Sequence, residues 1–472
     1  MKELNKKIKQ TIENIQYIYK NVDRPFVVGY SGGKDSTCTL QLVWHAIAKL
    51  PKNERTKKIF VISSDTLIET PAITNYIAQM IKAISQSAKK QNMPVSACCV
   101  YPITNNTFWV NLLGRGYPAP RTRFRWCTER LKIEPANRFI SDLVSQHGEA
   151  IMVLGARKDE SAVRAQVIAA TQSADNTTAG ALLPRHSSLP NCYVFSPIAD
   201  WTTSEVWEYL LHNSDTPWNT SNRDLAAIYK NSTAGECPLV VDKNTPSCGN
   251  SRFGCWVCTV VDENKSLENM VDNGETWLAP LLVYRSMLME TTDPDKKAKY
   301  RSYKRRTGQV HFQKRKNDDD TELKIIRGPY KFEWRQKFLL ELFKTQEELN
   351  KNYKDNKIQL ISEEELKAIR KIWITEENDW QDSVPKIYKE ITGKELDWGI
   401  DDSASFGIGE LEVLDEICRE HDIPVDLVAQ LLDKEKEFNA LGRRSTLTKE
   451  LESILKKEWR SESEVMEVTQ RS

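Results

Sequence analysis

Five short apolar runs, separated by stretches of helical periodicity, constrain the fold of the first half of this 472-residue chain. The runs are FVVGY (26–30), KIFVISSDT (58–66), VSACCVYP (95–102), AIMVLGAR (150–157) and CYVFSPI (192–198). Helices are expected from Pro71 to about Lys90 and around 128–145. Strands that alternate with helices predict a doubly wound α/β fold, with a mostly parallel sheet and helices on both faces. In such a sheet ligands bind beyond the carboxyl ends of the strands.

The rest of the chain changes character twice. A Cys- and Gly-containing insertion is expected at 231–285, after a sheet domain at 1–230. A basic linker or arm follows at 286–330, and its run 296–316 carries ten Lys or Arg and no acidic residue. From Phe332 onward the pattern is helical, so we expect a helical C-terminal domain at 331–472.

Charge and hydropathy exclude several functional classes. The formal net charge is only +1, so no field of the whole protein attracts nucleic acid, and any such contact requires a local basic patch. Two segments qualify: 115–132, where Phe124 and Trp126 interleave with basic residues, and the basic run 296–316. The alternative for both is a solvated charge run. Without a membrane-length apolar run or an apolar signal core, the protein is expected to be cytoplasmic, with no membrane partner.

The segment SGGKDS (31–36) ends the first apolar run and opens a helix. Its glycine turn presents backbone N–H groups to an anion, and the helix adds the positive end of its dipole. Lys34 supplies a point charge. Because Asp35 follows Lys34 where a Walker A loop needs Ser or Thr, this is a different phosphate loop. The residues expected to hold nucleotide phosphates are Ser31, Gly32, Gly33, Lys34 and Ser36.

A second charged cluster, GARKDESAVRA, follows the fourth run. Arg157, Glu160, Ser161 and Arg164 have the i, i+3, i+4, i+7 spacing of one helix face. Two arginines on one face suit a phosphate clamp in which Glu160 holds a guanidinium. The alternative is an exposed helix face with ordinary salt bridges.

The ten cysteines are not expected to form disulfides in a reducing compartment. Four of them fall within 22 residues and suit either zinc or an iron–sulfur cluster, namely Cys237, Cys248, Cys255 and Cys258. The alternative is a set of unliganded buried thiols. Cys127 lies among arginines that favour a reactive thiolate, although a buried position beside Trp126 fits equally well.

Several of these segments together carry a family resemblance. They are GYSGGKDST (29–37), ISSDTLIETP (62–71), FWVNLLGRGYPAPRTRFRWCTERLKIEP (108–135), GARKDES (155–161) and TPSCGNSRFGCWVCTVV (245–261). The loop resembles that of PP-loop ATP-pyrophosphatases (adenine nucleotide α-hydrolase-like fold), and GARKDES resembles their phosphoadenosine phosphosulfate (PAPS) reductase branch. Over nearly its whole length the chain resembles the DndC family, the sulfurtransferases of DNA phosphorothioation, to which the SspD proteins are related.

The resemblance implies an enzyme that uses ATP and Mg²⁺ to adenylate a DNA backbone phosphate, releases pyrophosphate and replaces a non-bridging oxygen with sulfur. Lys34 and Asp35 would serve pyrophosphate release, and Asp65 would contact adenosine unless it acts only as a helix cap. Arg157 and Arg164 would hold pyrophosphate or the DNA phosphate. The cysteine cluster would hold a [4Fe–4S] centre, and Cys127 is a candidate sulfur carrier. Implied partners are DNA, a cysteine desulfurase and other Dnd or Ssp proteins.

Three other functions fit parts of the pattern. A PAPS-reductase-like enzyme shares the loop and the arginines, but the chain has no cysteine after Cys418, whereas such reductases usually carry one in their tail. A tRNA thiolase uses the same activation on a base oxygen. A scaffold subunit would bind ATP and DNA without catalysis.

Overall fold

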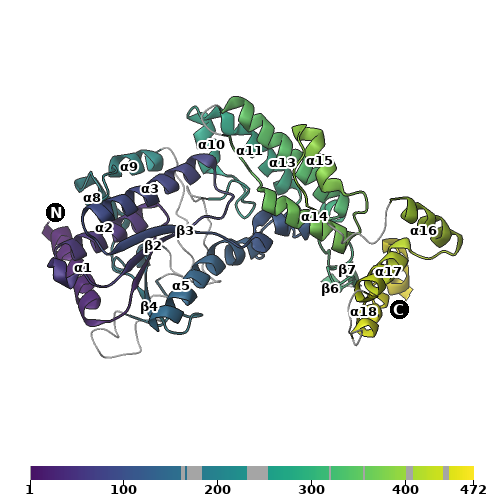
Figure 1. The fold of residues 1–472 in the computed structure, drawn as a ribbon, viewed down its shortest axis with the longest axis horizontal. Helices are drawn as coiled ribbons and strands as arrows, with labels where there is room; N and C mark the ends of the chain where they lie inside the picture. Colours follow the sequence, from purple (N-terminus) through teal and green to yellow (C-terminus); the bar gives the residue numbers. More distant parts are fainter. Residues whose placement is uncertain are drawn as a thin grey trace. The chain divides into compact units, whose positions relative to one another are not determined.

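The computed structural model describes residues 2–160, 165–166, 183–230, 254–317, 320–353, 357–399, 408–439 and 446–471. A parallel sheet organises the first part of the chain, with strand order β3-β2-β1-β4-β5 (Figure 1). Its strands are β1 (Phe26–Gly29), β2 (Ile59–Ser64), β3 (Val95–Val100), β4 (Ala150–Val153) and β5 (Cys192–Phe195). All four pairings are parallel. The predicted α/β sheet is therefore confirmed, with each strand inside its predicted run.

Helices cover both faces of this sheet. The helices of this part of the chain are α1 (Lys2–Asn21), α2 (Lys34–Ala48), α3 (Pro71–Lys90), α4 (Trp126–Thr128), α5 (Glu134–His147), α8 (Thr203–His212), α9 (Asn222–Lys230) and α10 (Lys265–Asp272). Alternate side chains of a strand point to opposite faces. Phe26 and Val28 accordingly pack with α1 and α2, whereas Val27 packs with Ile140 of α5. Figure 1 shows α2 and α3 over one face and α5 over the other.

The chain forms two compact units. Unit 1 combines Met1–Phe108 with Pro120–Arg285, and unit 2 combines Trp109–Ala119 with Ser286–Ser472. The piece 109–119 contains the π-helix Val110–Gly114 and is held within unit 2 by indole donors. The Nε1 of Trp109 donates to the carbonyl of Leu360 at 2.7 Å, and that of Trp373 donates to Leu113 at 2.9 Å. The domain boundaries expected from the sequence remain predictions.

Unit 2 is mainly helical, and the expectation of a helical C-terminal region is confirmed. Helix α11 (Ala279–Glu290) leads into it, and its own helices are α12 (Lys297–Tyr300), α13 (Phe332–Asn352), α14 (Glu363–Glu377), α15 (Ser383–Thr392), α16 (Ile408–Glu420), α17 (Val425–Asn439), α18 (Leu447–Leu455) and α19 (Glu462–Arg471). Across the described parts of the chain, every helix is too short or too polar to cross a bilayer.

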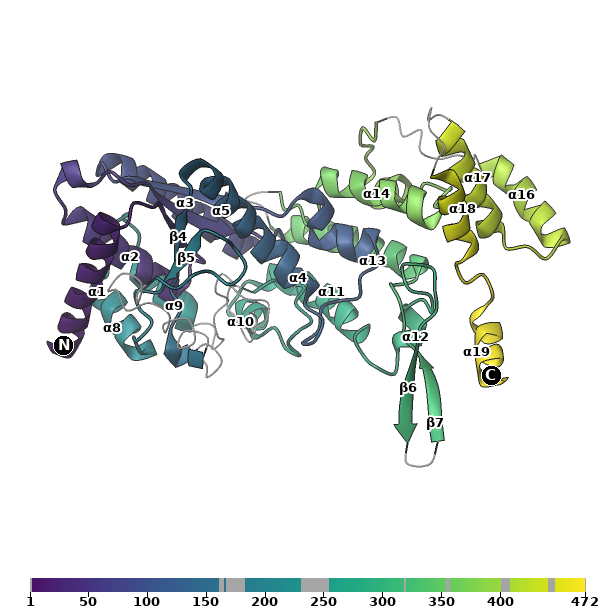
Figure 2. The ribbon, with the colours of Figure 1, turned by 90° about the horizontal axis from the view of Figure 1, so that it is seen from below.

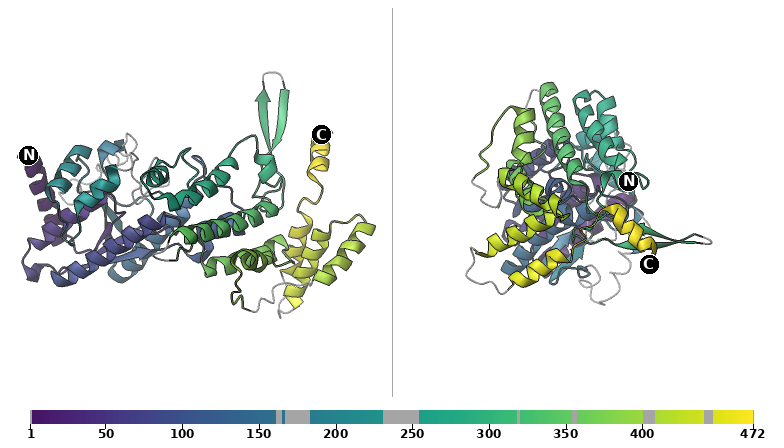
Figure 3. Two further views of the ribbon diagram at one scale, coloured as in Figure 1. Left: turned by 90° about the horizontal axis from the view of Figure 1, so that it is seen from above. Right: turned by 90° about the vertical axis from the view of Figure 1, so that its right-hand side faces the viewer.

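The basic run 296–316 lies in the segment 286–330, which composition predicts to be a basic linker or arm. It forms α12 and then enters an antiparallel ribbon of β6 (Phe312–Asn317) and β7 (Asp320–Ile325). Figures 2 and 3 show this ribbon projecting from unit 2, with α19 beside its base. Arg327, just after β7, donates to both carboxylate oxygens of Glu462 in α19. Sequence analysis missed the ribbon because its strands are rich in charge and lack apolar alternation.

Candidate functional site

The loop between β1 and α2 is built from its own glycines and serines. Helix α2 begins at Lys34, and its N-cap is Gly33, which has no side chain to cover the N–H groups of the first turn. Gly32 has a φ of +74°, and a Cβ there would lie 2.4 Å from Cδ1 of Ile77. Only glycine fits this conformation and this space. The loop is thus a tight glycine turn between a strand and a helix, and anion binding there remains a prediction.

The two serine hydroxyls of the loop hold it closed. Ser36 Oγ donates to the carbonyl of Gly33 at 3.0 Å and accepts from the backbone N–H of Ser31 at 3.2 Å. Ser31 Oγ lies 3.1 Å from Ser36 Oγ. Both hydroxyls therefore shape the loop, and their predicted contact with ATP phosphates remains a prediction.

Three charged side chains are buried next to the loop. Lys34, Asp35 and Arg157 are only 6%, 4% and 1% exposed. The Asp35 carboxylate accepts from Lys34 Nζ at 3.0 Å and from Arg157 Nε at 2.5 Å. Buried charges persist only when they are paired and hydrogen-bonded. The triad therefore fixes the first turn of α2 to the loop that follows β4.

Arg157 is held by further acceptors on the same loop and on α8. Its Nη1 donates to Asp159 at 3.2 Å and to Thr203 Oγ1 at 3.1 Å. Two carboxylates therefore hold Arg157, those of Asp35 and Asp159. The suggestion that Glu160 holds one guanidinium of the pair Arg157 and Arg164 remains a prediction. Arg157 precedes a single 3₁₀ turn, Lys158–Glu160, and Arg164 lies outside the described residues. The predicted clamp of two arginines on one helix face remains a prediction.

Gly155, the first residue of the GARKDES motif, permits this arrangement. A Cβ at Gly155 would lie 2.7 Å from the carbonyl carbon of Asp35 and 2.9 Å from the backbone nitrogen of Ser36. The end of β4 therefore touches the first turn of α2 backbone to backbone. Sequence analysis did not single out this glycine. Its position just after a strand was the available signal, because glycine there often marks a close backbone approach.

Tyr229 is a second residue that sequence analysis missed. Its hydroxyl accepts the backbone N–H of Lys34 at 2.7 Å, and Lys34 Nζ lies 5.9 Å from its ring centre. The ring also packs edge-on against Trp207 of α8 at 4.6 Å. The hydroxyl thus occupies a helix N-terminal N–H, the kind of group that binds phosphate oxygens. No local pattern reveals this contact, since 195 residues separate the partners.

A Cys-x-x-Cys turn packs on the loop that follows β2. The N–H of Cys258 donates to the carbonyl of Cys255 at 3.1 Å, and Trp256 N–H donates to Ile68 at 3.0 Å. Thr66 Oγ1 lies 3.6 Å from Cys255 Sγ. Strands β1 and β2 are parallel neighbours, so this turn and the Gly-rich loop both lie at the carboxyl edge of the sheet.

Acidic residues line the same β2 loop. Asp65 Oδ1 accepts the N–H of Leu67 at 2.8 Å and so caps its own turn, without capping a helix. Glu69 accepts from the N–H and the hydroxyl of Thr66. Burial, reinforced by the negative charge of Asp65, raises the pKa of Glu69 to about 7, against the opposing effect of Lys132. Asp65 as an adenosine contact remains a prediction.

The predicted cluster ligands are only partly visible. Cys255 and Cys258 are half-buried, and Arg285, 5% exposed, donates to the carbonyl of Cys258 at 2.8 Å. Cys237 and Cys248 lie outside the described residues. Among the residues that the structure does describe, no three His, Cys, Asp or Glu side chains form a metal-binding group. The visible pair nevertheless fits one half of a four-thiolate site, because the turn brings the two cysteines together and its backbone is anchored.

Cys127 lies in α4 and is half-buried. Its neighbour Trp126 is stacked on Phe108, with ring centres 5.3 Å apart. Arg125 Nε is buried without a hydrogen-bond partner among the described residues, and Phe124 is 41% exposed. The segment therefore combines an accessible aromatic ring with basic residues. Cys127 as a sulfur carrier remains a prediction.

Comparisons with known proteins identify the family of the chain. Residues 25–260, half of the chain, match the family model for the phosphoadenosine phosphosulfate reductase domain, and the chain belongs to that family. The family indicates an enzyme with a sulfur-transfer or nucleotide-activating role. Residues 410–456 match a second model, described as a small protein found in certain Dnd DNA modification systems.

Individual relatives are distant. An uncharacterized protein of Methanocaldococcus jannaschii is 26% identical over 248 residues, which are 52% of this chain but only 39% of that protein. Two solved structures share 13% identity with the chain. The U34-tRNA thiolase of Methanococcus maripaludis, with its [4Fe–4S] cluster, has a TM-score of 0.29 and covers 62% of this chain and 83% of its own. The Candida glabrata FMN adenylyltransferase, in complex with FAD and inorganic pyrophosphate, has a TM-score of 0.26 and covers 45% and 59%.

Proposed function

We propose that this protein is an ATP-dependent sulfurtransferase of the DndC type, which replaces a non-bridging oxygen of a DNA backbone phosphate with sulfur. The proposal rests on one observation, which is that a phosphate-type loop and a pair of cysteines lie at the same edge of the sheet. The nucleotide-type loop and the Cys-x-x-Cys turn lie at one carboxyl edge of one sheet, within one unit. An ATP-activating group and a sulfur-handling group would therefore work on the same substrate.

The chemistry requires two substitutions at phosphorus. A non-bridging phosphate oxygen is a poor leaving group, so it first attacks the α-phosphorus of ATP and displaces pyrophosphate. A sulfur nucleophile then attacks the DNA phosphorus and expels AMP. Lys34 and the N–H groups at the start of α2 would stabilise the departing pyrophosphate, with Mg²⁺ sharing the charge. Tyr229 would release the Lys34 N–H to a phosphate oxygen.

The cysteine residues define the sulfur-handling side. Cys255 and Cys258, with Cys237 and Cys248, would hold a [4Fe–4S] centre, which supplies a site for binding sulfide. Anchoring of the turn through Trp256 and Arg285 keeps its thiols at the edge of the sheet. A cysteine desulfurase would supply the sulfur as a persulfide, and an external thiol would reduce it to sulfide.

DNA as the acceptor is supported by residues 410–456, which match a small protein of Dnd DNA modification systems. The same match makes other Dnd proteins the expected partners. The exposed Phe124 within the basic segment 115–132 adds a surface suited to a nucleic-acid strand.

The test combines product analysis with one substitution. DNA from cells carrying the wild-type gene is expected to yield phosphorothioate dinucleotides after digestion, and Lys34→Gln is expected to remove them. The purified variant should release pyrophosphate from ATP about 10²–10³ times more slowly, because one preorganised charge is lost. Lys49→Gln, at the exposed far end of α2, is the matched control and should behave as wild type.

Other results would support one of the three alternative functions. A thionucleoside in tRNA with no phosphorothioate in DNA would make the protein a tRNA thiolase. Reduction of phosphoadenosine phosphosulfate by the purified protein, without DNA modification, would make it a reductase. A wild-type protein that releases no pyrophosphate even with DNA and its partners would be a scaffold.

The metal centre has its own prediction. Protein purified without oxygen is expected to be brown, and Cys255→Ser or Cys258→Ser should remove the colour and the bound iron, since each loses one thiolate ligand. Cys418→Ser, in unit 2, is the control and should leave both unchanged. A colourless wild-type protein with one tightly bound zinc would show that the site is a structural zinc site.

A further inference from the structure

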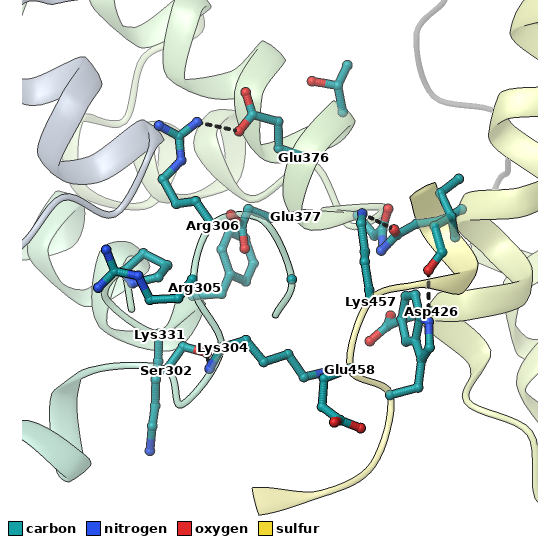
Figure 4. Close-up of a pocket in the computed structure, with 18 of the residues that line it drawn as sticks. Ser302, Lys304, Arg305, Arg306, Lys331, Glu376, Glu377, Asp426, Lys457 and Glu458 are labelled. Carbon is teal, nitrogen blue, oxygen red and sulfur yellow. Dashed lines mark hydrogen bonds and ion pairs between the residues drawn. The ribbon is translucent and has the colours of Figure 1, made fainter. Parts of the chain in front are cut away.

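A polar cavity of about 510 Å³ lies within unit 2, far along the chain from the Gly-rich loop (Figure 4). Its walls are the loop 302–308, the end of α14 at 375–378, one side of α17 and the segment 454–459. The loop and the last segment are tied together, because Glu458 N–H donates to the carbonyl of Gly308 at 2.9 Å. The volume suits a ligand of nucleotide size.

Three cations of this cavity have neutral partners in place of carboxylates. Lys304 Nζ lies 5.3 Å from the ring centre of Tyr303 and 5.4 Å from that of Trp459. Lys457 Nζ donates to Gln430 Oε1 at 2.7 Å, and Arg305 Nη1 donates to the carbonyl of Arg327 at 3.3 Å. Within the described residues, none of these three cations forms an ion pair. An anion can therefore bind without displacing a carboxylate.

Most acidic side chains of the cavity are already engaged. Their arginine partners lie at 3.3, 2.7 and 2.7 Å in the pairs Arg306–Glu376, Arg335–Glu377 and Arg460–Glu458. Two carboxylates remain, on Asp426 and Asp433 of α17. Asp433 Oδ1 is buried without a hydrogen-bond partner among the described residues. A ligand that fits the cavity therefore carries both an anionic group and a hydrogen-bond donor.

The lysines also repel one another. Burial lowers the pKa of Lys304. Burial, and then the like charges of Lys434 and Lys304, lower the pKa of Lys457. Asp426 and Glu458 oppose this effect at Lys304, and Glu377 opposes it at Lys457, but burial outweighs these carboxylates. A bound anion would further stabilise these half-buried cations.

We propose that this cavity binds a phosphate group of a nucleotide unit, with Lys304, Arg305 and Lys457 as its cationic contacts. The unit belongs either to a nucleic-acid strand or to a free nucleotide. Both sources present phosphate to the cations and a base or sugar donor to Asp433. The α17 wall lies in the stretch that matches a small protein of DNA modification systems.

The experiment measures binding by the full-length protein. Labelled DNA oligonucleotides, single- and double-stranded, are titrated at several salt concentrations against the Lys304→Gln, Lys457→Gln double variant. If a strand binds in the cavity, affinity falls about tenfold or more and the slope of log Kd against log salt falls by about two. The control is Lys344→Gln, Lys389→Gln, which removes the same charge from exposed positions of unit 2 and should bind as wild type.

A second arm tests the free nucleotide. Binding of labelled AMP is measured in a Lys34→Gln background, which weakens the Gly-rich loop, with and without the two cavity substitutions. Loss of AMP binding supports the proposal and assigns a free nucleotide, whereas loss of DNA binding supports it and assigns a strand. If neither ligand responds to the cavity variant, the proposal is overturned.

Folding of the variant is checked by its melting temperature. Because the lysines repel one another, the double variant is expected to melt at or above the wild-type temperature. If it melts at a lower temperature, binding is measured with the Lys304→Arg, Lys457→Arg double variant instead, because this variant keeps both positive charges. Binding retained in the arginine variant supports the proposal, and binding lost there overturns it. Because the experiment measures binding, its result does not depend on whether the protein forms phosphorothioate in DNA.

Discussion

Replacing Asp35 by alanine is expected to lower the free energy of unfolding by about 3–5 kcal/mol, because it leaves two buried cations without their shared carboxylate. Lys34 and Arg157 are 6% and 1% exposed, so water cannot compensate. The same change should abolish pyrophosphate release, since the first turn of α2 loses its connection to the loop after β4. Urea denaturation followed by circular dichroism measures the first effect, and an ATP pyrophosphate assay measures the second.

Asp159→Asn is the matched control for this change. Asp159 also contacts Arg157, at 3.2 Å, but its side chain is 48% exposed, so solvent screens the charge that is lost. The control should therefore unfold close to the wild-type denaturant concentration and retain pyrophosphate release. If Asp35→Ala is no less stable than Asp159→Asn, the buried triad does not hold the loop.

The fold of unit 1 was predictable because its signals are local. Each strand is a short apolar run beside a turn residue, and Pro71 marks the start of α3 where it was expected. The Gly-rich loop was predictable for the same reason, since its glycines, Lys34 and Ser36 all fall within residues 32–36. The β6–β7 ribbon was not, because its charged strands lack the apolar alternation on which strand prediction depends.

The contacts that complete the site were beyond sequence reasoning because they join distant residues. Arg157 is 122 residues from Asp35, and Tyr229 is 195 from Lys34. Helical spacing indicates only neighbours along one helix, so it could not reveal the contact between Arg157 and Asp35. The placement of 109–119 in unit 2 is of the same kind, since it depends on the packing of Trp109 against Leu360.

Gly155→Ala is expected to reduce pyrophosphate release about 10²-fold, although Gly155 carries no side chain that could contact a substrate. The new methyl group would lie 2.7 Å from the carbonyl carbon of Asp35 and 2.8 Å from its oxygen. These are backbone atoms and cannot rotate away, so the first turn of α2 must shift. A shift of about 1 Å in a positioned group costs about that factor in rate. The overpacking should also cost about 1–3 kcal/mol of stability.

Gly148→Ala is the control that separates the displacement of α2 from the general cost of replacing a glycine. Gly148 has a φ of +80° and no atom within 4 Å of an added Cβ, so alanine there meets only backbone strain of about 1–2 kcal/mol. The two variants should thus lose similar stability, but only Gly155→Ala should lose pyrophosphate release. Equal activity in both would mean that α2 tolerates displacement from β4. In that case the close contact between their backbones serves packing, and phosphate positioning depends on the loop alone.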